Sequence, residues 1–139
     1  MPRGFVKKET ISTLCEEFKK HNYIDPDLNE RYNVKRGLRN SDGTGVMAGL
    51  TQICNVHGYI MNEGEKQPVE GELTYRGYNI RDLIGACNRE RRYGYEEVSY
   101  LLLFGSLPTA EQLEFFRMVL SQARSLPQDF VQDMILKAP

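Results

Sequence analysis

The sequence predicts a mainly α-helical protein with a small antiparallel β-ribbon. Apolar residues recur at helical spacing towards both ends of the chain, whereas strict alternation of apolar and polar residues is confined to two short central stretches. Hydrophobic residues make up 40% of the 139 residues and the net charge is −1, a composition typical of soluble globular proteins. The absence of a basic excess disfavours a nucleic-acid-binding protein, and no run of about 18 apolar residues suggests a membrane span.

The cysteines indicate a reducing compartment. There are three of them, Cys15, Cys54 and Cys87, with no C-x-x-C pair. An odd number at wide spacing fits neither a disulfide framework nor a zinc site, so we expect free thiols and no metal. The N-terminus has no apolar core before a small-residue cleavage site, and we therefore expect a cytoplasmic protein.

The N-terminal third is predicted to contain one long helix, one short helix and an arm. A stripe at i, i+3, i+4 and i+7 predicts an amphipathic helix over residues 6–22, formed by Ile11, Leu14, Cys15 and Phe18. Pro26 suits the first position of a short helical turn that ends at Tyr32. Residues 33–45 are basic and then glycine-rich, without a helical stripe, which indicates a loop or an extended arm.

Two alternating stretches, residues 50–56 and 73–76, predict the strands of the ribbon. The residues between them include several Gly, Asn and Pro, which favour turns, so we expect a long polar connection. His57 precedes Gly58 at the expected end of the first strand. We interpret this histidine as a turn residue, because no partner base or nucleophile is near it in the sequence.

Helices dominate the C-terminal half. Asn79 is expected to cap a helix over residues 80–87, followed by a solvated charged connector over residues 89–92. The next helix, residues 95–104, is apolar on most faces and should be buried among other helices. Gly105 should end it in a left-handed conformation.

The last two helices are predicted to be separated by Pro127. Thr109 and Gln112 match the capping box, which predicts a helix that extends to about residue 125. A final helix is expected over residues 128–137. Together these helices carry more apolar side chains than a small domain can bury on one face, which predicts an exposed patch formed by Phe115, Phe116, Val119, Phe130 and Met134.

Three stretches of the chain carry a resemblance to a known family. Residues 37–46, continued by 49–51 and 55–59, are similar to the N-terminal arm and first strand of a bacterial enzyme. Residues 70–80 are similar to a recurring G-x-L-x-Y-R-G-Y-x-I element, and residues 96–112 to the helix-turn-helix that follows it. In this order and at this spacing, the stretches resemble citrate synthase.

The resemblance implies that residues 1–139 are the N-terminal segment of a longer enzyme. The segment would comprise a helix and an extended arm (1–49), the β-ribbon (50–76) and helices (77–139) of the large domain. The full-length enzyme would be an acyltransferase of the tricarboxylic acid cycle that condenses acetyl-CoA with oxaloacetate to citrate and CoA. The resemblance further implies no cofactor, a homodimer or higher homo-oligomer, and no nucleic-acid or membrane partner.

No catalytic residue is assigned within this sequence. The family's catalytic groups are two histidines, in H-G-G-A-N-E-like and G-x-G-H-R-V-Y-like motifs, and an aspartate; neither motif occurs here, and His57-Gly58 shares only two letters with the first. Removing a proton from the acetyl methyl group needs a carboxylate base and a donor to the thioester oxygen. We therefore expect this segment alone to be inactive.

Arg39 is the one residue to which the resemblance carries a binding role. An arginine in the family's N-terminal arm approaches the phosphates of coenzyme A, and Arg39 in the Gly37-Leu38-Arg39 stretch is at the similar position. The nearby Lys35 and Arg36 would also suit an anion, although the spacing does not match a P-loop. The alternative is an ordinary exposed arginine of the arm.

Two other functions remain open at this stage. A 2-methylcitrate synthase, which uses propionyl-CoA, would be expected to share the same scaffold. A natural short protein that keeps only this scaffold would be a non-catalytic interaction module.

Overall fold

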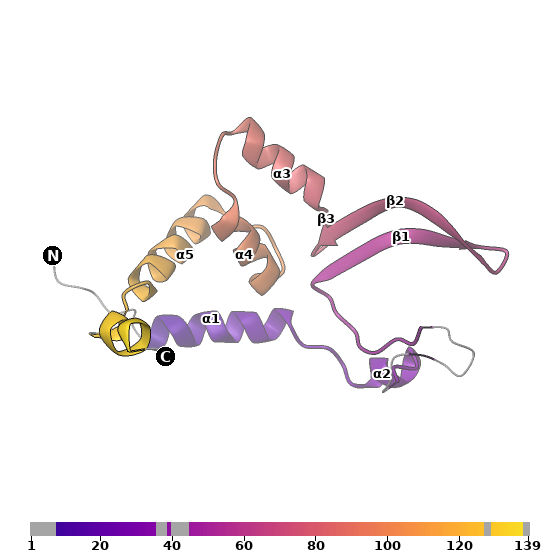
Figure 1. The fold of residues 1–139 in the computed structure, drawn as a ribbon, viewed down its shortest axis with the longest axis horizontal. Helices are drawn as coiled ribbons and strands as arrows, with labels where there is room; N and C mark the ends of the chain where they lie inside the picture. Colours follow the sequence, from indigo (N-terminus) through magenta and orange to yellow (C-terminus); the bar gives the residue numbers. More distant parts are fainter. Residues whose placement is uncertain (1–7, 36–38, 40–44, 127–128, 138–139) are drawn as a thin grey trace.

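The computed structural model describes residues 8–35, 39, 45–126 and 129–137. Its elements, in chain order, are α1 (Lys8–His21), α2 (Asp27–Arg31), β1 (Cys54–Asn62), β2 (Glu65–Tyr75), β3 (Tyr78–Asn79), α3 (Ile80–Arg89), α4 (Tyr95–Phe104), α5 (Ala110–Ala123) and the π-helix η1 (Val131–Leu136). Helix α4 contacts both α1 and α5, and the β1–β2 hairpin projects away from these helices (Figure 1). The predicted fold class, mainly α with a small antiparallel sheet, is confirmed.

The ribbon is longer than predicted, and its connection is shorter. β1 pairs antiparallel with β2 from Cys54 opposite Tyr75 to Asn62 opposite Glu65. Only Glu63 and Gly64 lie between the strands, both with positive φ (51° and 86°), as a two-residue type I′ hairpin turn requires. The predicted long polar connection is therefore wrong. Polar residues continue in the strands because both faces of this hairpin are exposed, so burial imposes no alternation.

The helix ends follow the local sequence signals. The Asn79 side chain accepts a hydrogen bond from the Arg81 N–H at 2.9 Å, which starts α3. Gly105 ends α4 with φ 82°. Thr109 and Gln112 form the complete capping box of α5, with bonds of 2.8 and 3.2 Å. All three predicted ends are confirmed, because each depends on residues within one helical turn.

The core lies between α4 and α5. In the described part of the chain the buried hydrophobic side chains are Leu101, Phe104, Phe116 and Val119. The Tyr100 ring lies 4.5 Å from that of Phe104 and 5.6 Å from that of Phe116, measured between centroids. Burial raises the pKa of the Tyr100 hydroxyl above its ordinary value. The apolar character of α4, noted in the sequence, is explained by this packing.

The C-terminal predictions need two corrections. The last element is a π-helix over Val131–Leu136 rather than a helix over residues 128–137, and residue 128 lies outside the described residues. The predicted apolar patch is also wrong in part. Phe116 and Val119 are buried, because their face of α5 packs against α4, whereas Phe115 and Met134 are exposed as expected.

None of the described helices combines the length and the hydropathy that a membrane span requires.

Candidate functional site

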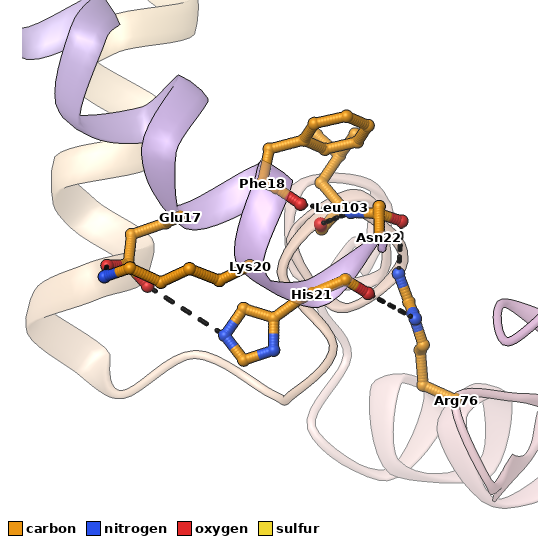
Figure 2. Close-up of polar contacts among 7 residues, drawn as sticks. All are labelled: Glu17, Phe18, Lys20, His21, Asn22, Arg76 and Leu103. Carbon is orange, nitrogen blue, oxygen red and sulfur yellow. Dashed lines mark hydrogen bonds and ion pairs between the residues drawn. The ribbon is translucent and has the colours of Figure 1, made fainter. Parts of the chain in front are cut away.

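The arginine of the Y-R-G-Y element lies at the junction of the helices and the sheet. Arg76 and Gly77 form the tight turn between β2 and β3, with positive φ at both residues (50° and 88°). The Arg76 backbone N–H donates to the Ile53 carbonyl at 2.8 Å, which joins this turn to the residue before β1. The turn therefore directs the Arg76 side chain from the sheet towards the ends of α1 and α4 (Figure 2).

All five N–H donors of the Arg76 guanidinium have an acceptor. Nε donates to Leu102 O at 3.3 Å, and Nη2 donates to the same oxygen at 3.0 Å and to Asn22 Oδ1 at 2.7 Å. Nη1 donates to His21 O at 3.1 Å and to Gln52 O at 3.4 Å. All four acceptor residues are distant from Arg76 in the chain. A guanidinium with every donor engaged has none left for a substrate carboxylate or phosphate. Arg76 therefore has a positioning role: it holds the ends of α1 and α4 at the sheet.

Asn22 extends this junction between the two helices. Its side-chain amide donates to Phe18 O in α1 at 2.7 Å and to Leu103 O in α4 at 2.9 Å, while its oxygen accepts from Arg76 (Figure 2). The carbonyls at the C-terminal end of a helix have no partner within the helix, and they carry the negative end of its dipole. One cation and one amide therefore satisfy the C-terminal ends of α1 and α4 together.

His21 belongs to this junction through its backbone alone. Its carbonyl accepts from Arg76, whereas its exposed imidazole Nε2 lies 3.9 Å from Glu17 Oε2 (Figure 2). A hydrogen bond from Lys20, 2.5 Å long, lowers the pKa of Glu17 below its ordinary value. At 3.9 Å the imidazole and this carboxylate are too far apart for a hydrogen bond, so the contact does not fix the ring.

The other histidine is not in a turn, contrary to the sequence interpretation. His57 lies inside β1 opposite Glu72, next to an irregularity of the register between His57 and Tyr59. Its side chain is exposed. Within the described ranges no three His, Cys, Asp or Glu side chains are grouped as a metal site would need.

The arm that contains Arg39 is described only in part. Arg39 forms an isolated antiparallel bridge with Gly45 and is exposed, while Arg36 lies outside the described residues. The Lys35 backbone N–H donates to Met47 O at 3.0 Å, so the two ends of the arm lie side by side. Lys35 and Gly45 line one small cavity, and the phosphate contact of Arg39 stays a prediction.

An apolar groove of about 420 Å³ between α3 and α4 was not foreseen from the sequence. Its walls include Ile80, Leu83, Ile84, Val98 and Leu102. At its rim Gly94 lies so close to Cys87 that a Cβ added there would be 2.5 Å from the sulfur. The apolar faces of α4 predict burial, but not that a gap remains between α4 and α3.

Comparison with known proteins identifies the family. The family model of the citrate synthase C-terminal domain matches residues 37–139, which include the Y-R-G-Y element and α3 to η1. The chain belongs to the citrate synthase family. Helices α1 and α2 precede the matched region, yet Arg76 inside it holds the end of α1.

Individual relatives of the citrate synthase family include both of its named activities. The chain is 39% identical over 93 residues to 2-methylcitrate synthase 1 of Corynebacterium glutamicum, covering 67% of the chain and 19% of that protein. It is 40% identical over 104 residues to a citrate synthase of Saccharolobus solfataricus, covering 74% and 22%. It is 45% identical over 56 residues to a 2-methylcitrate synthase of Shewanella oneidensis, covering 40% and 13%.

The chain matches about a fifth or less of the length of these relatives. No solved structure matches the chain.

Proposed function

We propose that this chain is the N-terminal scaffold and dimerisation segment of a citrate synthase, which condenses acetyl-CoA with oxaloacetate to citrate and CoA. The observation that carries the proposal is membership of the citrate synthase family over residues 37–139. The full-length enzyme is proposed to be a cytoplasmic homodimer or higher homo-oligomer that needs no cofactor beyond its two substrates.

Within that enzyme, the segment positions elements rather than transforming substrate. Arg76 and Asn22 join the ends of α1 and α4 to the sheet, and all donors of the guanidinium are engaged. The His21–Glu17 contact is exposed and, at 3.9 Å, too long for a hydrogen bond, so it does not orient a base towards a thioester methyl group. The catalytic groups are therefore proposed to lie outside this segment.

Residues 1–139 alone should release no CoA from acetyl-CoA and oxaloacetate above the uncatalysed rate. Free thiol formation measures this directly, with the longer protein that contains this chain as the positive control. Enzyme-level turnover by the segment would contradict the proposal. If His57→Ala then abolished that turnover, the site would be at His57 instead.

A 2-methylcitrate synthase is the second candidate, because relatives with this name match the chain as well as a citrate synthase does. The longer protein should be assayed with acetyl-CoA and with propionyl-CoA. A higher kcat/KM for acetyl-CoA supports the first proposal, and a higher value for propionyl-CoA supports the second. No release with either thioester would favour a non-catalytic interaction module.

Arg39→Ala in the longer enzyme should raise the KM for acetyl-CoA about tenfold, because a lost charged contact of about 1.4 kcal/mol changes affinity by one decade. The kcat and the KM for oxaloacetate should barely change, since a phosphate contact is equal in ground and transition states. The effect should shrink at high salt, which screens exposed charges. Arg117→Ala, at an exposed ion pair with Glu114, is the control. A KM within about twofold of the parent would make Arg39 an ordinary arm residue.

A further inference from the structure

We draw no further inference here: the strongest candidate, the apolar groove between α3 and α4, belongs to a chain that spans about a fifth of the length of its relatives, and nothing in the described part of the structure shows what covers it.

Discussion

Replacing Arg76 with methionine should lower the free energy of unfolding by about 3 kcal/mol. Charged hydrogen bonds contribute about 1.5–3 kcal/mol each, but the acceptors of Arg76 are half-exposed and partly regain water, so the total is far below the sum. Urea unfolding followed by circular dichroism measures the change. Amide exchange in α1 should also become faster, because Arg76 and Asn22 join its end to α4.

Two further variants separate the fork geometry of Arg76 from its charge. Arg76→Lys keeps the charge but has three donors and no planar fork, and should lose about 2 kcal/mol. Arg81→Met removes another arginine of the same region, whose ion pair with Glu70 is exposed, and should leave the urea midpoint unchanged. Equal effects of Arg76→Met and Arg81→Met, or unchanged exchange in α1, would contradict the positioning role.

Phe116→Ala should lower the free energy of unfolding by about 4 kcal/mol, a loss typical of a buried phenylalanine. Phe116 is 5% exposed, and its ring lies 5.6 Å from that of Tyr100 and 5.9 Å from that of Phe104, both edge-on. The substitution leaves a cavity and removes two aromatic contacts, each worth about 0.5–1.5 kcal/mol beyond burial. Urea unfolding measures the loss, and a variant already unfolded without urea meets the expectation.

The neighbouring phenylalanine provides the control for Phe116→Ala. Phe115 is 43% exposed, so Phe115→Ala should cost less than about 1 kcal/mol. The two variants differ by one position on α5 and are identical in chemistry. Similar losses for both would mean that the packing between α4 and α5 is not as described.

The elements that sequence reasoning predicted well are those whose signals are local. The caps at Asn79 and Thr109 and the stop at Gly105 each depend on groups within one turn of the helix. The hairpin is predicted only in part, because Glu63 and Gly64 lie within the stretch that the sequence predicts to be one long polar connection. With both faces of the hairpin exposed, the residues between the predicted strands lacked the alternation that burial imposes.

The orientation of α5 about its axis shows why the buried residues could be assigned only from the structure. The apolar stripe of this helix is wide, and both Phe115 and Phe116 belong to it. Only the position of α4 determines that Phe116 and Val119 are covered while Phe115 is exposed.

The sequence by itself determined the family, the fold class and most helix ends, because motif order, periodicity and caps are properties of neighbouring residues. Only the tertiary structure decided the role of Arg76. Its acceptors come from Asn22, Gln52 and other residues 24 to 55 positions away in the chain. Folding brings the C-terminal ends of two helices together, and their unpaired carbonyls then engage every donor of one guanidinium.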